Sequence, residues 1–177
     1  MFGRGRYEPG QKTIRGIVFP AIGVYLALAI VLGPMADNGS LLDLHSRRVI
    51  GWAISNRMKK DLAIRALNMA IALRSPPKGC IHHTDRGSQY CSHDYQKILR
   101  KHGLKASMSG KGNCYDNAAV ESFFKSLKAE MMWRRNWQTR REVEVAIFEY
   151  INGFYNPRRR HSALGWKSPV AFERKAA

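Results

Sequence analysis

Residues 41–55 read LLDLHSRRVIGWAIS, with apolar runs on either side of a polar turn at residues 45–47. This pattern predicts two neighbouring strands joined by that turn. The next regular segment, DLAIRALNMAIALR at residues 61–74, predicts a helix, because Asp61 suits the positive end of a helix and two prolines follow its last turn. The region therefore begins with a strand pair followed by a helix.

Further strands and helices follow along the chain. The segment GCIHHT at residues 79–84 predicts a short strand that ends at Asp85. A helix, a strand and two more helices are then expected at residues 92–102, 104–108, 117–132 and 141–154. This order predicts an α/β domain whose sheet is partly antiparallel and partly parallel.

The charge of the chain is strongly unbalanced. Its 177 residues include 30 Lys and Arg against 13 Asp and Glu, a formal net charge of +17. A surplus of this size points first to nucleic acid as a partner and second to an anionic membrane surface. The three cysteines are an odd and sparse set, which argues against a disulfide-stapled secreted domain.

Residues 1–40 form an atypical N-terminal segment with a charge-free apolar run, IVFPAIGVYLALAIVL, at residues 17–32. As a helix this run would span about 24 Å, short of the roughly 30 Å hydrocarbon core of a bilayer. Pro20 and Gly23 weaken it further as a helix. A basic start before an apolar run also resembles a weak secretory signal. The alternative is a pair of buried strands, since Val, Ile and Tyr favour sheets.

Two carboxylates are the candidate catalytic residues. Asp85 follows a predicted strand, where α/β sheets place their ligands, and 35 residues separate it from Glu121 on a predicted helix. Asn117, Glu121, Lys125 and Lys128 fall on one polar face of that helix. Paired carboxylates would hold a hard divalent cation beside phosphate oxygens. The alternative is that Glu121 and Lys125 form an ordinary surface ion pair.

Three stretches carry a resemblance to a known family: HHTDRGSQYCS at 82–92, SMSGKGNCYDNAAVESFFKSLKAE at 107–130 and YINGFYNPRRRHSALGWKSP at 150–169. With DLHSRRVIGWAIS at 43–55, they resemble bacterial insertion-sequence transposases of the DDE kind, whose superfamily includes retroviral integrase. The resemblance implies an α/β fold with a ribonuclease-H-like mixed sheet flanked by helices. It also implies that residues 41–177 form an integrase or transposase catalytic core with a basic C-terminal helix and tail.

The resemblance also implies the chemistry. In this family three acids hold two Mg²⁺ or Mn²⁺ ions for DNA cleavage and strand transfer, and Asp85 and Glu121 match the second and third acids. The expected partners are element ends and target DNA, with a homo-oligomer as the active form, a cytoplasmic location and no stable membrane partner. The residues expected to bind nucleic acid are Lys111, Asn117, Lys125, Lys128, Arg158, Arg159, Arg160 and His161.

The chain departs from the family at the first acid. The family carries that acid on its first strand, roughly twenty residues before the position of Asp43, but no Asp or Glu occurs in residues 9–36. Asp37 and Asp43 are the nearest acids, and Asp43 matches a family position outside the catalytic three. We therefore expect a degraded first strand, replaced by unrelated sequence, and a transferase incomplete at its first metal ligand. The alternative is a catalytically inactive DNA-binding remnant of a transposase.

Two weaker signals concern metal and base binding. The cysteines and histidines at 80–93 lack the paired spacing of structural zinc sites, so we interpret His82 and His83 as strand residues. Trp133 and Trp137 lie among arginines and are candidates for contacting DNA, whereas Trp52 is expected in the core.

Overall fold

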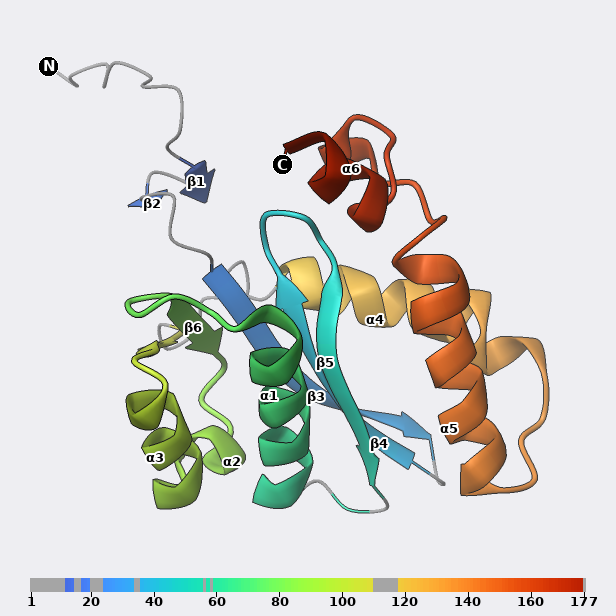
Figure 1. Ribbon diagram of the computed structural model, residues 1–177. Helices are drawn as coiled ribbons and strands as arrows, with labels where there is room; N and C mark the ends of the chain where they lie inside the picture. The colour runs from blue at the N-terminus through green and yellow to red at the C-terminus, as the bar shows by residue number, and fades with distance from the viewer. Residues whose placement is uncertain are drawn as a thin grey trace, which may run out of the picture.

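The computed structural model of the chain describes residues 12–14, 17–19, 24–33, 36–55, 57, 59–109 and 118–176. It shows a mixed sheet with helices α1, α2 and α3 on one face and α4 and α5 on the other (Figure 1). The predicted mixed sheet flanked by helices is therefore confirmed.

The central sheet has five strands, in the order β5-β4-β3-β6-β7. β3 pairs antiparallel with β4, and β4 with β5, whereas β3 and β7 each run parallel to β6. A separate hairpin joins β1 (Lys12–Ile14) and β2 (Ile17–Phe19). The strands of the central sheet are β3 (Val24–Gly33), β4 (Ala36–Asp43), β5 (Val49–Ser55), β6 (Ile81–Thr84) and β7 (Lys105–Met108).

The long helices lie where the hydrophobic periodicity predicts them, and several short ones were not expected. The α-helices are α1 (Lys60–Arg74), α2 (Ser88–Cys91), α3 (His93–Lys101), α4 (Ala118–Glu130), α5 (Arg140–Glu149) and α6 (Pro169–Ala176). Short 3-10 turns, η2 (Met132–Arg134) and η4 (Ser162–Leu164), and a π-helix, η3 (Tyr150–Tyr155), complete the fold. The predicted last helix therefore ends in a π-helical turn, and α2 and α6 were missed.

The apolar run of residues 17–32 contributes the central strand of the sheet. β3 is paired on both edges, and helices cover both faces of the sheet, which explains why its sequence is continuously apolar instead of alternating. The expectation of a degraded first strand is corrected in part: residues 24–33 form a strand, and this strand carries no Asp or Glu. The boundary expected at residue 41 falls inside β4. None of the helices in the described residues is long and apolar enough to span a membrane.

Two hydrophobic cores hold the layers together. On one face Leu41, Ile50 and the buried side of α1 form a cluster, and on the other Leu42 packs with the aromatic side chains of α4. Gly51 permits the first of these contacts, because a Cβ there would lie 2.2 Å from the carbonyl oxygen of Ala66 on α1. The absence of a side chain at Gly51 therefore allows α1 to pack closely against the sheet.

Side chains cover the outer edge of β5. The Asn156 amide accepts a hydrogen bond from the Val49 backbone N–H and donates one to the Val49 carbonyl, each at 3.0 Å. The Arg65 guanidinium donates to the carbonyl of Ile54 at 2.6 Å. These contacts satisfy backbone groups that would otherwise offer an open sheet edge to another chain.

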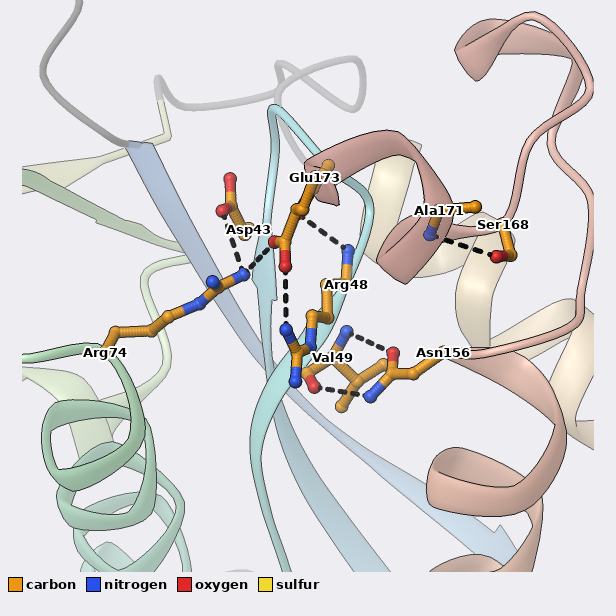
Figure 2. A network of polar contacts seen from close by, with 9 residues as sticks. Asp43, Arg48, Val49, Arg74, Asn156, Ser168, Ala171 and Glu173 are labelled. Atoms are coloured by element: carbon orange, nitrogen blue, oxygen red, sulfur yellow. Dashed lines mark hydrogen bonds and ion pairs between the residues drawn. The ribbon is translucent and has the colours of Figure 1, made fainter. Parts of the chain in front are cut away.

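A polar network attaches the C-terminal helix to the β4–β5 turn. Figure 2 shows the Arg74 guanidinium between the carboxylates of Asp43 and Glu173, while Arg48 donates to Glu173 at 2.7 Å. Asp43 also accepts a hydrogen bond from the His45 backbone N–H at 2.9 Å. Residues from α1, the turn and α6 are therefore joined by one set of ion pairs.

We expect the free energy of unfolding to fall on acidification because of His82. Its Nε2 lies 2.7 Å from the Tyr95 hydroxyl in the core, and burial, followed by the neighbouring His83, lowers the pKa of His82 from 6.5 to about 3. Between pH 6.5 and about 3, the unfolded state therefore binds a proton at His82 that the folded state does not bind. The stability should drop by up to about 1.4 kcal/mol per pH unit from this residue.

Urea unfolding at several pH values measures this effect. In the His82→Phe variant the slope of stability against pH should be shallower than in the parent, whereas the exposed His93→Gln control should keep the parent slope. Equal slopes in His82→Phe and the parent would show that His82 does not stay neutral in the fold.

Candidate active site

Asp85 lies directly after β6, at the carboxyl end of the strand. Its Oδ1 accepts a hydrogen bond from the Gly87 backbone N–H at 2.9 Å, which orients the carboxylate in a tight turn. Two residues earlier, His83 contacts Ser107 at 2.9 Å through Nδ1 and Ser109 at 3.2 Å through Nε2. His83 is within β6, whereas Asp85 is the first residue after the strand.

Glu121 is exposed in the first turn of α4. The predicted core stripe of this helix is confirmed, since Val120, Phe123, Phe124 and Leu127 are all buried. They pack in one cluster with Leu42 of β4, and α4 contacts both β3 and β4. The helix that carries Glu121 therefore covers one defined face of the sheet.

The same face includes His83 of β6, two residues before Asp85. Leu42 is paired with Leu26 of β3, and Leu26 is paired with His83 of β6. Paired residues on neighbouring strands share a face, so positions 42, 26 and 83 lie on the side covered by α4. Asp85 follows β6 two residues after His83. The helix that carries Glu121 thus covers the face of the sheet to which His83 belongs, and Glu121 itself is exposed.

The strand register shows which residue of β3 follows its last pair with β6. Ala27 pairs with Thr84, the last residue of β6, so Leu28 and Asp85 are the next residues along the two parallel strands. Leu28 is also paired with Ser40 of β4, which is buried and donates to Asn38 Oδ1 at 2.5 Å. A polar pair thus borders position 28, and within the described residues the Asn38 side-chain nitrogen has no hydrogen-bond partner.

Asp43 and Asp37 both lie away from the end of β6 at which Asp85 follows. Asp43 is paired with Tyr25 and Asp37 with Val31, each three positions along β3 from Leu28. At about 3.3 Å per residue, each backbone lies roughly 10 Å along the sheet from the level of Asp85, and one strand further across it. The carboxylate of Asp43 is bound to Arg74 in addition. Asp37 lies in strand β4, not in the irregular loop that Asn38 and Gly39 suggest.

The predicted DNA-binding residues have different surroundings. Lys125, Arg158 and Arg160 are exposed, and Lys128 is half-buried. Arg159 instead binds Glu130, at 2.8 Å between Nη2 and Oε1, and this hydrogen bond raises the pKa of its guanidinium. Lys111 and Asn117 lie outside the described residues.

Burial, followed by the charges of Arg159 and Arg47, lowers the pKa of His161 to about 4, so its imidazole is neutral at pH 7. His161 therefore adds no positive charge to the surface at neutral pH. Sequence reasoning gave Arg159 a phosphate contact because it could not show the ion pair with Glu130, 29 residues away.

Metal binding through histidine and cysteine is not supported by the part of the chain that the structure describes, since no group of three His, Cys, Asp or Glu side chains there is arranged to hold an ion. His82 is in the core with Tyr95, as the strand interpretation predicts. Trp133 is 74% exposed, whereas the Trp137 ring lies beneath the Arg135 guanidinium at 4.1 Å.

Two family models, each described as an integrase core domain, match residues 38–114 and 121–176. The chain belongs to the integrase core family. The two matched segments include Asp85 and Glu121, respectively, and begin after β3. The sequence resemblance to DDE-type insertion-sequence transposases is confirmed.

Relatives of this integrase core chain are found among bacterial insertion sequences. It is 52% identical to the transposase InsF for insertion sequence IS3A of Escherichia coli (strain K12) over 135 residues, 76% of this chain and 47% of that protein. It is 50% identical over 133 residues to an uncharacterized 31 kDa protein of insertion element IS600 from Shigella sonnei, covering 75% of this chain and 49% of that protein. The chain spans about half the length of these relatives.

Solved structures confirm the ribonuclease-H-like fold. A chain of the simian T-cell lymphotropic virus intasome in complex with PP2A regulatory subunit B56 gamma superposes with a TM-score of 0.70 at 17% identity, over 93% of this chain and 60% of that one. The HTLV-2 integrase catalytic core domain in complex with magnesium, in a trimeric form, gives a TM-score of 0.58 at 14% identity, over 84% and 94%. At these identities the similarity concerns the fold alone.

Proposed function

We propose that this chain is the core of a DNA transposase that acts in DNA cleavage and strand transfer, incomplete at its first metal ligand. The observation that supports this proposal is that Asp85 follows β6 of the central sheet and Glu121 lies on α4, the helix that packs against this sheet, in an integrase core fold. Carboxylate oxygens are the ligands that suit hard divalent cations. The transposase relatives and the net charge of +17 support DNA as the substrate.

The donor set in the described residues fits a divalent cation in part. Asp85 and Glu121 would supply oxygen ligands to Mg²⁺ or Mn²⁺, and β3 carries no acid among its residues VYLALAIVLG. A bound ion would supply Lewis-acid activation of a hydroxyl nucleophile and stabilise the departing oxygen. The protein's own contribution is to orient Asp85 through the Gly87 N–H and to keep Glu121 on a helix packed against the sheet.

Basic side chains on α4 and in the C-terminal part of the chain would position the DNA backbone. Lys125 and Lys128 share the helix of Glu121, and Arg158 and Arg160 are exposed in the turn after the π-helix. Such contacts hold phosphates without reading sequence. We further propose that the active form is a homo-oligomer and that it acts on DNA in the cytoplasm, as expected for a bacterial transposase.

DNA binding should be strong at low salt and weak at high salt. For wild type, log affinity for a duplex should fall steeply with log salt, with each phosphate contact contributing about 0.9 to the slope. We expect Lys125→Gln combined with Arg158→Gln to lower the slope by about two contacts. The exposed Lys101→Gln control on α3, at the opposite face of the sheet, should leave it unchanged. A wild-type slope near zero in fluorescence anisotropy would contradict the proposed function.

A further inference from the structure

An open pocket of about 470 Å³ lies next to the helix that carries Glu121, between α4 and the C-terminal turn, by which we mean residues 155–166. Its size is within the range of about 300–1,000 Å³ that is usual for ligand sites. Ala118, Ser122 and Ser126 line it from one flank of α4, whereas Glu121 occupies the adjacent flank. The pocket and Glu121 therefore occupy separate but neighbouring flanks of one helix.

A half-buried cation faces this pocket. Arg47, from the β4–β5 turn, lines it together with Arg160, and burial lowers the pKa of the Arg47 guanidinium. None of the ion pairs found in the described residues involves Arg47. A partly desolvated charge without a counterion is costly, and an anionic ligand would offset that cost.

The lining of the pocket also includes an exposed aromatic residue. Trp166 lines the pocket, is 69% exposed and has a φ of +60°, a left-handed conformation that bulky residues rarely adopt. Its backbone is held in place, because the Trp166 N–H donates to the His161 carbonyl at 2.9 Å and the His161 N–H to the Lys167 carbonyl at 3.1 Å. Strain of this kind, kept by surrounding bonds, is typical of binding sites.

We infer that this pocket binds one unpaired nucleotide of DNA, with its phosphate on Arg47 and Arg160 and its base stacked on Trp166. The inference rests on the proposed function, because it takes DNA as the ligand. An exposed indole next to cations suits a base and its phosphate, since every base has a face for stacking.

The test compares DNA probes that differ only at one unpaired nucleotide. Fluorescence anisotropy with the full chain would measure the affinity for a blunt duplex, for the same duplex with a single-stranded thymidine tail, and for that duplex with an abasic tail. Wild type should bind the thymidine tail about tenfold more tightly than the abasic tail. Trp166→Ala should remove this difference, and Trp166→Phe should keep part of it. Phe148→Ala, a control at an exposed aromatic residue of α5 that does not line this pocket, should keep all of it.

The phosphate half of the site has its own measurement. Arg47→Gln should lower the salt slope for the tailed duplex by about one contact and leave the slope for the blunt duplex unchanged. Circular dichroism melting checks that each variant is folded.

The outcomes separate this inference from the proposed function. Failure of wild type to bind any duplex in a salt-dependent way would contradict the proposed function itself. Salt-dependent binding with equal affinity for thymidine and abasic tails, or a preference that survives in Trp166→Ala, would overturn the pocket assignment while leaving DNA binding in place. Equal loss of slope on both probes in Arg47→Gln would place that arginine on duplex backbone instead.

Discussion

Replacing Leu28 with aspartate is expected to create divalent-metal binding and to raise metal-dependent nicking or joining of DNA by about three decades over the parent chain. The register places position 28 level with Asp85 on the next strand and beside the buried Ser40 hydroxyl. A carboxylate at position 28 would add a third negatively charged metal ligand to Asp85 and Glu121. The parent chain is expected to be inactive or nearly so.

Matched variants distinguish a metal ligand from a general effect of charge. Leu28→Asn has almost the same size as Leu28→Asp but no charge, and Ala27→Asp adds the same charge at the neighbouring position, on the other face of the strand. Neither should bind Mn²⁺ in calorimetry. Glu121→Gln or Asp85→Asn introduced beside Leu28→Asp should remove both metal binding and activity while keeping affinity for DNA.

Two results would overturn this assignment. One is a folded Leu28→Asp variant that neither binds Mn²⁺ nor gains thermal stability from it. The other is strand transfer by the parent chain that is lost on Asp37→Asn or Asp43→Asn, which would identify a substitute ligand.

Asn156→Ala is expected to lower the free energy of unfolding by about 2–5 kcal/mol. The change leaves the N–H and the carbonyl of Val49 without their side-chain partner at a buried edge of the sheet. Each buried backbone group left unsatisfied costs about 1–3 kcal/mol. Urea unfolding at neutral pH measures the difference.

An exposed amide nearby provides the control for this variant. The Asn152 side chain also donates to a backbone carbonyl, that of Phe148 at 3.0 Å, but it is exposed to solvent. Asn152→Ala should therefore change the stability by no more than about 0.5 kcal/mol. Equal effects of the two variants would show that the Asn156 contacts do not hold the C-terminal turn to β5.

Element types were predictable from the sequence wherever the hydrophobic period is a local property. The helix of residues 61–74 and the buried stripe of α4 follow from side chains three and four apart, which neighbours in the chain already specify. The apolar run at 17–32 could not be interpreted in the same way. A strand covered on both faces has no alternation, so its sequence looks the same as that of other buried segments.

The sequence by itself determined the excess of positive charge that favours nucleic acid as a partner, the α/β fold class and the two candidate carboxylates. These depend on composition, on the hydrophobic period along the chain and on short motifs. Only the tertiary structure decided that β3 is central, that Leu28 is level with Asp85, and that Arg159 is bound to Glu130. It also brought Asn156 to Val49 across 107 residues and placed Trp166 and Arg47 in the lining of one pocket. The physical reason is that pairing, register and pocket walls join residues far apart in the chain, and no local pattern of side chains records which of them meet.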